Sequence, residues 1–305
     1  MDQAERLREL VKAKKENETI EEKDEVFTVP NKKTAKIIAV ASGKGGVGKS
    51  NFTVNVAIEL SRLGNRVMIL DADLGLANVD IIFGINPKYN LSHFIKEEKD
   101  IKDIITETEY GVKVIASGSG VKELVNLSNQ QRQQFIEKLS EIENMVDILL
   151  IDTGAGISRN TLSFIYASDY SIVITTPEPT ALMDAYGLIK VTTLSKQNVP
   201  LKLIVNMVNS KEEAKEIASR VVLLSRRFLN TFVEPYGLIY RDKNVLNSVM
   251  AQKPFLVLYP NTKATECIKE IAKRIVSRLN SIQNIERKED EVNTGLFQRI
   301  FSFLK

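Results

Sequence analysis

The chain has 305 residues, of which 43% are hydrophobic and 27% charged, which suffices for one large globular domain or two small ones. Its formal net charge of +3 is too small to indicate nucleic-acid binding by itself. The single cysteine, Cys267, excludes an internal disulfide and any CxxC metal or iron–sulfur site within one chain.

The two ends of the chain differ from its middle. Residues 1–11 have helical spacing, and residues 12–25 carry many charges of both signs, which is typical of a solvated linker. We therefore expect residues 1–35 to be a helix and a linker outside the core. The charged start does not resemble a signal peptide, and no apolar run reaches the roughly 20 residues that span a bilayer, so we expect a cytoplasmic protein.

Six short apolar runs alternate with helical stretches from residue 36 onward. Buried strands that alternate with helices are typical of a parallel sheet. We therefore predict an α/β fold of the P-loop NTPase type for residues 36–283, with a mostly parallel sheet and helices on both faces. The predicted strands are residues 37–41, 67–70, 112–116, 148–151, 171–175 and 201–205, and the clearest helices are residues 50–64 and 262–279.

A glycine-rich segment, GKGGVGKS, follows the first predicted strand and opens a helix, which is the context that a phosphate-binding P-loop requires. Glycines let successive backbone N–H groups turn toward phosphate oxygens, and the helix N-terminus adds partial positive charge. Lys49 supplies a full positive charge for the β- and γ-phosphates, and the Ser50 hydroxyl can bind Mg²⁺. We therefore predict that ATP or ADP is bound by Gly43, Lys44, Gly45, Gly46, Val47, Gly48, Lys49, Ser50 and Asn51.

A second lysine, Lys44, stands near the start of this loop. The whole segment resembles the deviant Walker A loop of the MinD/ParA family of P-loop ATPases. In that family the early lysine crosses a dimer interface and contacts the phosphates bound by the partner. The resemblance therefore implies a homodimer that forms with ATP, and roles in hydrolysis for Lys44 and Lys49.

Two acidic segments, DADLGLAN and DTGAGIS, follow the second and fourth predicted strands. Carboxylates at the carboxyl ends of parallel strands lie beside the ligand in open α/β sheets. Both segments resemble the two switch segments of MinD/ParA ATPases. That resemblance implies that Asp73 orients the attacking water, that Asp152 holds a water of the Mg²⁺ ion, and that Asp71 supports the ligand shell of the metal.

Two more residues are candidates for contact with adenine. Asn206 follows the last predicted strand, where the family has an asparagine that hydrogen-bonds the base. Asp242 stands in an Ile-Tyr-Arg-Asp segment, where relatives often have Ile-Pro-x-Asp, so this position departs from the family pattern. Asp242 either contacts the base or only caps the helix that follows.

Residues 284–305 read as a charged linker and an amphipathic C-terminal helix. At 100° per residue its apolar side consists of Leu296, Phe297, Ile300, Phe301, Phe303 and Leu304. Phenylalanines beside basic residues suit insertion into the interface of an anionic bilayer. MinD-like ATPases carry such a tail, which implies reversible attachment to the inner face of the cell membrane. The alternative is a helix that docks on its own core or on a partner.

The segment DQAERLR near the N-terminus resembles the DQAxxLR motif of the FlhG (YlxH) family, MinD relatives that control flagellar number. In that family the segment stimulates FlhF, a GTPase of the signal-recognition-particle type, and the family also contacts components of the flagellar switch complex. The resemblance implies that Gln3 lies nearest the nucleotides of FlhF. The other residues implied to contact that partner are Asp2, Arg6, Leu7 and Arg8.

Two other classes of function are compatible with the P-loop. One is a cell-division or DNA-partition ATPase; the first would not need residues 1–11, and the second would need a dense basic surface that the sequence lacks. The other is a metabolic or metal-handling enzyme, but iron–sulfur carriers need cysteines that are absent. We therefore expect a slow, dimer-dependent ATPase that regulates flagellar number and placement and binds no nucleic acid.

Overall fold

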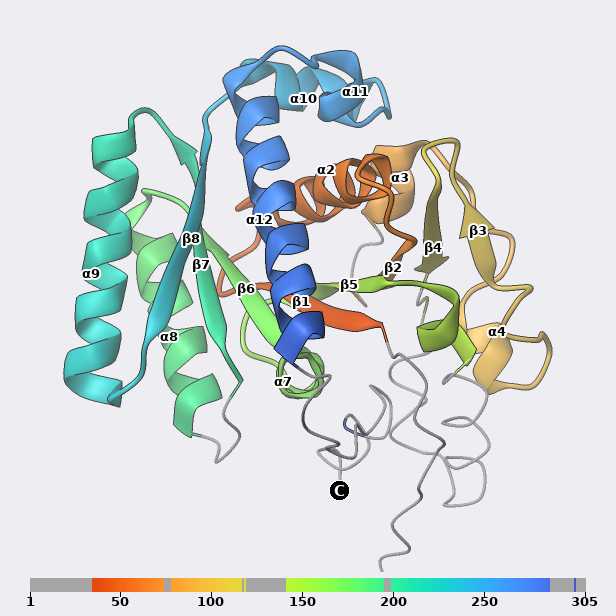
Figure 1. Cartoon of the computed structure of the whole chain (residues 1–305), viewed down its shortest axis with the longest axis horizontal. Helices are drawn as coiled ribbons and strands as arrows, with labels where there is room; N and C mark the ends of the chain where they lie inside the picture. The colour runs from red at the N-terminus through yellow and green to blue at the C-terminus, as the bar shows by residue number, and fades with distance from the viewer. Residues whose placement is uncertain are drawn as a thin grey trace, which may run out of the picture. The chain divides into compact units, whose positions relative to one another are not determined.

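An eight-stranded sheet forms the centre of the computed structural model, in the order β3-β4-β2-β5-β1-β6-β7-β8 (Figure 1). The structure describes residues 35–73, 78–116, 118, 141–194, 199–285 and 299. Strand β3 runs antiparallel to β4, and the other neighbouring strands pair in parallel. The predicted α/β class with a mostly parallel sheet is confirmed.

Six strands coincide with the six predicted apolar runs, and two were not predicted. The predicted ones are β1 (Lys36–Ser42), β2 (Val67–Ala72), β4 (Val112–Ala116), β5 (Ile148–Ala155), β6 (Tyr170–Thr175) and β7 (Leu201–Val208). The additional strands, β3 (Ile105–Glu107) and β8 (Val233–Tyr240), lie at the two edges of the sheet.

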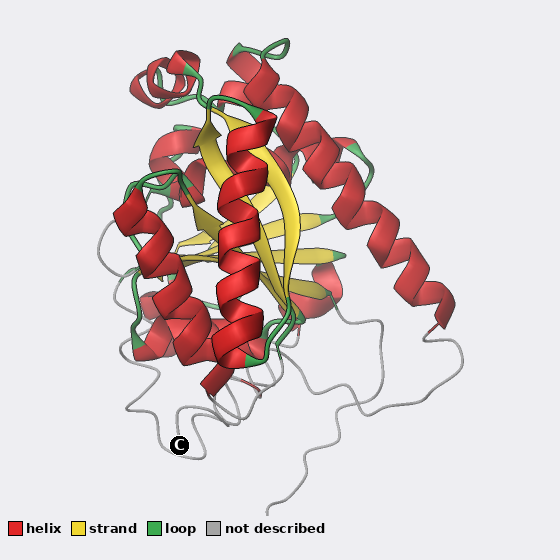
Figure 2. Ribbon diagram, turned by 90° about the vertical axis from the view of Figure 1, so that its left-hand side faces the viewer, coloured by secondary structure: helices red, strands yellow, loops and turns green. Residues whose placement is uncertain are grey.

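Helices cover both faces of the sheet, as predicted. Helices α2 (Lys49–Arg62) and α12 (Lys263–Ile285) pack on one face, and α7 (Arg159–Ala167), α8 (Pro179–Leu194) and α9 (Lys211–Leu229) pack on the other (Figures 1 and 2). Four further short helices are α3 (Val79–Phe83), α4 (Leu91–Ile95), α10 (Lys243–Met250) and α11 (Phe255–Leu258), and residues 141–145 are also helical. None of the described helices is long and apolar enough to cross a membrane.

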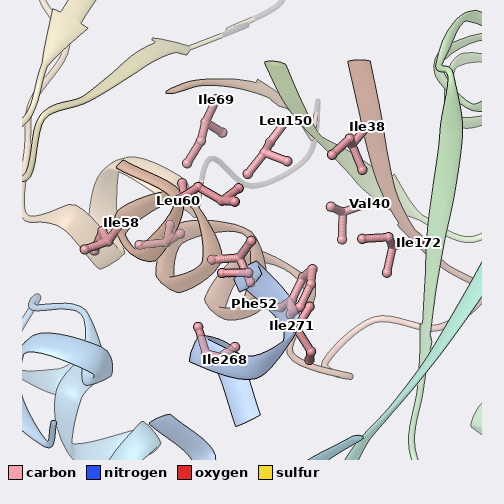
Figure 3. Close-up of a cluster of buried hydrophobic side chains, with 14 of the residues drawn as sticks. Ile38, Val40, Phe52, Ile58, Leu60, Ile69, Leu150, Ile172, Ile268 and Ile271 are labelled. Carbon is pink, nitrogen blue, oxygen red and sulfur yellow. The ribbon is translucent and has the colours of Figure 1, made fainter. Parts of the chain in front are cut away.

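Alternate residues of β1 show how the central strands are buried on both sides. Ile38 and Val40 belong to the core under α2 and α12, whereas Ala39 and Ala41 belong to the core under α8 and α9. Figure 3 shows Phe52 of α2 beside side chains of α12, with side chains of the sheet above them. Burying an aliphatic or aromatic side chain of this size contributes about 1.5–3 kcal/mol, so these layers stabilise the sheet.

Helix α12 is longer than the sequence pattern predicted. It runs from Lys263 to Ile285, past the expected end at residue 279 and two residues past the expected end of the core at residue 283. Neither glycine nor proline occurs between residues 279 and 285 to stop it. The first strand, β1, begins at Lys36.

Candidate nucleotide site

The glycine-rich loop connects the end of β1 to the start of α2. Gly46 and Gly48 have φ angles of 78° and 90°, which side chains rarely tolerate, so the loop needs glycine at both positions. Gly48 stands immediately before α2, and the backbone N–H of Phe52 donates to its carbonyl at 2.9 Å. The loop therefore curls against the N-terminus of a long helix, which is the arrangement that binds phosphate.

Gly43 fixes the loop against α8. A Cβ atom at this position would lie 2.1 Å from the backbone oxygen of Asp184, so only glycine lets the end of β1 approach α8 this closely. On the other side of the loop, Asn206 Nδ2 donates to the carbonyl oxygen of Val47 at 2.7 Å. The loop is therefore held between α8 and the end of β7.

Lys49 and Asp152 form a buried ion pair at the centre of the site. The Lys49 ammonium lies 3.2 Å from Asp152 Oδ1, and the two side chains are 7% and 0% exposed. Thr53 Oγ1 donates to the same oxygen at 3.3 Å. Burial raises the pKa of Asp152, and Lys49 together with the Ser50 and Thr53 hydroxyls opposes that rise.

Asp152 and Asn51 each keep an unused oxygen at this site. Asp152 Oδ2 and Asn51 Oδ1 are buried and have no hydrogen-bond partner. Within the described part of the chain, no group of three His, Cys, Asp or Glu side chains could enclose a metal. A Mg²⁺ ion that takes Ser50, waters and phosphate oxygens as its ligands fits this donor set, with Asp152 Oδ2 left to hold one of the waters.

Asp71 lies beside Asp152 across the sheet. The two residues are register partners on β2 and β5, and Asp71 is 2% exposed. Its carboxylate accepts the backbone N–H groups of Asp73 at 3.1 Å and Val79 at 3.3 Å. Burial and the neighbouring charge of Asp152 nevertheless raise the pKa of Asp71 to about 7. A carboxyl group with this pKa is about half ionised at neutral pH, and added positive charge nearby would favour its ionised form.

Asp73 lies where the switch segments face each other. It follows β2 and lines the cavity of the loop, and a Cβ atom on Gly154 of β5 would lie 3.7 Å from Asp73 Oδ1. This oxygen therefore stands beside the strand that carries Asp152. That position beside the phosphate loop is compatible with orienting a water, and the role itself stays a prediction.

The loop opens into a cavity of 870 Å³. Its phosphate end is lined by the predicted loop residues from Lys44 to Asn51, but not by Gly43, and its other end is walled by β8, the β8–α10 connection and α10. Asn206 and Asp242 both line it. The volume suits a nucleotide, since small-molecule sites span about 300–1,000 Å³.

The two candidate base contacts already make hydrogen bonds within the chain. Asn206 Oδ1 accepts the N–H of Met207 at 2.8 Å, but the side chain keeps a second N–H and a second lone pair for a base. Asp242 is the N-cap of α10 and accepts the N–H of Asn244 at 2.9 Å. The capping role of Asp242 is thus present in the structure, and its contact with adenine stays a prediction.

Lys44 points toward α8 in the single chain. Its ammonium donates to Glu178 Oε1 at 2.5 Å and to Thr180 Oγ1 at 2.8 Å. Neither partner was predicted from the sequence, and the same is true of Thr53 and of the contact of Gly43 with α8. The spacing of Thr53, one turn of helix beyond Lys49, is the one signal that could have identified it.

The predicted contacts at the two ends of the chain lie outside the described residues. These are Asp2, Gln3, Arg6, Leu7 and Arg8 at the start, and Leu296, Phe297, Ile300, Phe301, Phe303 and Leu304 at the end. Of the C-terminal segment only Arg299 is described: it is helical, and its guanidinium lies 3.4 Å from Asp169 Oδ1.

Comparisons with known proteins agree with this geometry. The ParA family model, described as NUBPL iron-transfer P-loop NTPase, matches residues 33–276. Antiactivator FleN of Pseudomonas aeruginosa is 36% identical over 79% of this chain and 86% of its own length. Flagellum site-determining protein YlxH of Helicobacter pylori is 36% identical over 82% of this chain and 85% of its own length.

The fold is also found in solved structures. The septum site-determining protein MinD of Pyrococcus horikoshii, complexed with Mg-ADP, superposes with a TM-score of 0.65 at 22% identity, over 81% of this chain and 98% of that one. Sheet order, phosphate loop and sequence relatives point to the same conclusion. The chain belongs to the ParA/MinD family of P-loop ATPases and is similar within it to FleN and YlxH.

Proposed function

We propose that this chain is an ATP-dependent switch that controls the number and placement of flagella. The observation that carries the proposal is 36% identity over about four-fifths of the chain to an antiactivator, FleN, and to a flagellum site-determining protein, YlxH. In this proposal ATP drives the formation of a homodimer, the dimer attaches to the inner face of the cell membrane, and hydrolysis returns the protein to a cytoplasmic monomer.

The described residues can perform the steps at the nucleotide as follows. The amides of the loop and the ammonium of Lys49 bind the β- and γ-phosphates, and Asp73 holds the attacking water in line. Mg²⁺, held by Ser50 and by a water on Asp152, would supply positive charge to the phosphate oxygens. Binding of Mg²⁺ and phosphate would place charge of both signs beside Lys49 and Asp152, which form a buried ion pair with each other.

The surface beside the loop supports a dimer in which the two nucleotide sites face each other. Ile157 and Met183 are 49% and 59% exposed. Ile157 lies against α8, because a Cβ atom on Gly187 of that helix would be 3.6 Å from Ile157 Cδ1. Met183 immediately precedes Asp184, the residue of α8 on which Gly43 packs. Apolar side chains next to Lys44 would be covered by a second copy, which would bring each Lys44 toward the nucleotide of the other.

The proposed partners follow from the two ends of the chain. Residues 295–305 would insert into an anionic membrane surface, and residues 1–11 would stimulate a GTPase of the FlhF type. Contacts with proteins of the flagellar switch complex belong to the same proposal. None of these segments is needed to build the nucleotide site, since the residues that line it lie between Ser42 and Ile268.

The alternative functions fit less well. The septum site-determining protein MinD of Bacillus subtilis is only 25% identical over 87% of this chain. Iron transfer, which appears in the description of the family model, would need metal ligands, and the one cysteine, Cys267, is buried on α12. A division ATPase is the better of the two alternatives. Like the proposed flagellar switch it would form a dimer and attach to the membrane, but it would have no GTPase partner.

Light scattering coupled to size-exclusion chromatography tests the proposal. We expect a monomer without nucleotide or with ADP, and a dimer with ATP and Mg²⁺. Liposomes of anionic lipid should bind the dimer more strongly than the monomer, because two weak anchors act together. A chain that remains monomeric with ATP at all accessible concentrations would contradict the proposed switch.

A further inference from the structure

Lys44 is held on its own chain by a closed triangle of polar groups. Its ammonium donates to Glu178 Oε1 at 2.5 Å and to Thr180 Oγ1 at 2.8 Å, and the Thr180 hydroxyl donates to the same Glu178 oxygen at 2.8 Å. The ion pair is partly open to solvent, with side-chain exposures of 35% for Lys44 and 56% for Glu178. Lys44 therefore has a defined alternative to any contact with a second chain.

The backbone on both sides fixes this geometry. Gly43 packs directly on the carbonyl of Asp184, so the residue that follows it must lie beside the first turns of α8. Glu178 immediately precedes Pro179, the first residue of α8. A carboxylate at a helix N-terminus is stabilised by the helix dipole, and proline suits the first helical position. Thr180 thus lies in the first turn of α8 and Glu178 immediately before it, so the start of this helix presents both side chains to Lys44.

From this arrangement we infer that Glu178 and Thr180 form a latch that keeps Lys44 on its own chain, and that the latch must open before Lys44 can reach phosphates bound by a second copy. The inference rests on the proposed ATP-dependent dimer and adds a regulatory contact to it. The Glu178 carboxylate and the triphosphate of the other copy compete for the same ammonium, because a lysine side chain can point in only one direction at a time.

The competition sets how readily the dimer forms. Holding Lys44 in the latch stabilises the monomer, so the concentration needed for dimerisation rises. An exposed ion pair of this kind shifts an equilibrium by up to about fivefold. Because each protomer must open one latch, the dimerisation constant changes by up to about 25-fold when both latches are removed.

The opposite arrangement is physically possible and gives the opposite result. If Glu178 stayed bound to Lys44 within the dimer and aimed it across the interface, removal of the carboxylate would weaken the dimer. The sign of the effect of one substitution therefore decides between a latch and an aiming group.

The test uses the full chain with a non-hydrolysable ATP analogue and Mg²⁺, and measures the concentration at half-dimerisation by analytical ultracentrifugation. Glu178→Gln keeps the size of the side chain and removes its charge. We expect it to dimerise at roughly tenfold lower concentration than the wild type, and Thr180→Val to change in the same direction by less. Glu216→Gln is the matched control, because it breaks another exposed ion pair, with Arg220 on α9, away from the loop.

A second measurement reports on the latch without the dimer. Acetylation of the Lys44 amine, followed by mass spectrometry in the absence of nucleotide, should be several-fold faster in Glu178→Gln than in the wild type, and unchanged in Glu216→Gln. Equal acetylation rates, or a higher dimerisation concentration for Glu178→Gln, would overturn the latch. A wild type that never dimerises with ATP would instead refute the proposed function, and the acetylation rates would still test the latch.

Discussion

The Lys49 ammonium lies 3.2 Å from Asp152 Oδ1, and this ion pair is almost completely shielded from water. Removing two charges from water is costly, and their mutual attraction repays that cost only while both partners remain. In the nucleotide-free protein each residue therefore depends on the other. The pair joins the helix that follows the phosphate loop to the strand of the second switch segment, so its integrity affects the fold as well as the site.

Asp152→Ala should lower the free energy of unfolding of the nucleotide-free protein by about 3–5 kcal/mol, because it leaves the Lys49 ammonium buried without a counter-charge. Urea denaturation followed by circular dichroism measures this. The double variant with Lys49→Met should recover much of the loss, since neither charge is then buried. If the double variant is as unstable as Asp152→Ala alone, packing and the hydrogen bond from Thr53 explain the loss instead.

Asp73→Ala should bind ATP and dimerise but lose hydrolysis, because the γ-phosphate keeps its loop contacts while the attacking water loses its orienting group. Positioned groups of this kind contribute about 10²–10⁴-fold to rates, so we expect at least a hundredfold drop in phosphate release. The variant should accumulate as a dimer in light scattering, whereas Lys44→Ala should bind nucleotide and remain a monomer. An Asp73→Ala chain that cannot be loaded with ATP would indicate a role in binding or folding.

Lys202 on β7 should make the free energy of unfolding depend on pH. Its side chain is 4% exposed and its ammonium lies over the rings of Tyr170 and Tyr236, at 3.7 and 4.2 Å from their centroids. Burial, assisted by the charge of Arg278, lowers the pKa of Lys202 to about 8, compared with about 10.4 in an unfolded chain. The folded state therefore binds this proton less tightly than the unfolded chain does, although the amine is still mostly protonated at pH 7. This residue lowers the free energy of unfolding at pH 7 by an amount that disappears as the pH rises from about 8 toward about 10.4.

Lys202→Met should accordingly raise the free energy of unfolding at pH 7 by about 1–2 kcal/mol, after allowing for the lost contacts with the tyrosine rings. The gain should shrink as the pH approaches 10. Urea unfolding at pH 7 and pH 10 measures it, with the exposed Lys215→Met as the control. Tyr236 stays neutral throughout because burial raises its pKa to about 12. A loss of stability at both pH values would show that the ring contacts outweigh the cost of burial.

Much of the fold could be predicted from sequence because central parallel strands are buried on both faces and appear as continuous apolar runs. The two missed strands lie at the edges, where that reasoning fails. β3 is only three residues long, and the sequence of β8 contains Pro235 and Gly237, which are unusual within strands. Pro235 is tolerated because β8 is an edge strand. Gly237 is needed because a Cβ atom there would lie 2.9 Å from Ile271 of α12. Packing, and not the β-propensity of its residues, therefore determines this strand.

The phosphate loop could also be predicted, since its glycines, lysine and serine follow from the chemistry of phosphate binding. The contacts of Lys44 could not, because Glu178 is 134 residues away along the chain and only the packing of Gly43 on α8 brings the two together. The hydrogen bond from Asn206 of β7 to the carbonyl oxygen of Val47 could not be predicted either, although Asn206 was expected at the site and lines the cavity. Long-range contacts of this kind depend on the order of the strands.

Phe301→Glu should abolish membrane binding while ATP binding persists, a prediction that rests on sequence because the residue lies outside the described part of the chain. A charge on the apolar side of an inserted helix costs a few kcal/mol. Flotation with anionic liposomes and ATP should fall to background. Gln298→Glu adds the same charge on the polar side and should weaken binding much less. Equal flotation of the wild type with ADP and with ATP would contradict the coupling of attachment to the dimer.

A synthetic peptide of residues 1–20 should accelerate GTP hydrolysis by the FlhF-type partner without the ATPase core. Its apolar stripe, which includes Leu7, suits a groove on another protein, and its polar side carries Gln3 and Arg6, groups that can orient water or pair with phosphate. A peptide this short should be mostly disordered in water and fold on binding. Phosphate release at saturating peptide concentration measures the acceleration.

Two variants of the peptide separate binding from catalysis. Leu7→Asp should weaken binding, so that more peptide is needed for the same rate. Gln3→Ala should lower the rate at saturation more than it lowers affinity, because an amide that orients water acts mainly in the transition state. Deleting residues 1–20 from the full chain should leave ATP hydrolysis and liposome binding intact. If the unmodified peptide does not accelerate GTP turnover at saturation, residues 1–11 are not an activator, and a MinD-like division ATPase becomes the better explanation of the chain.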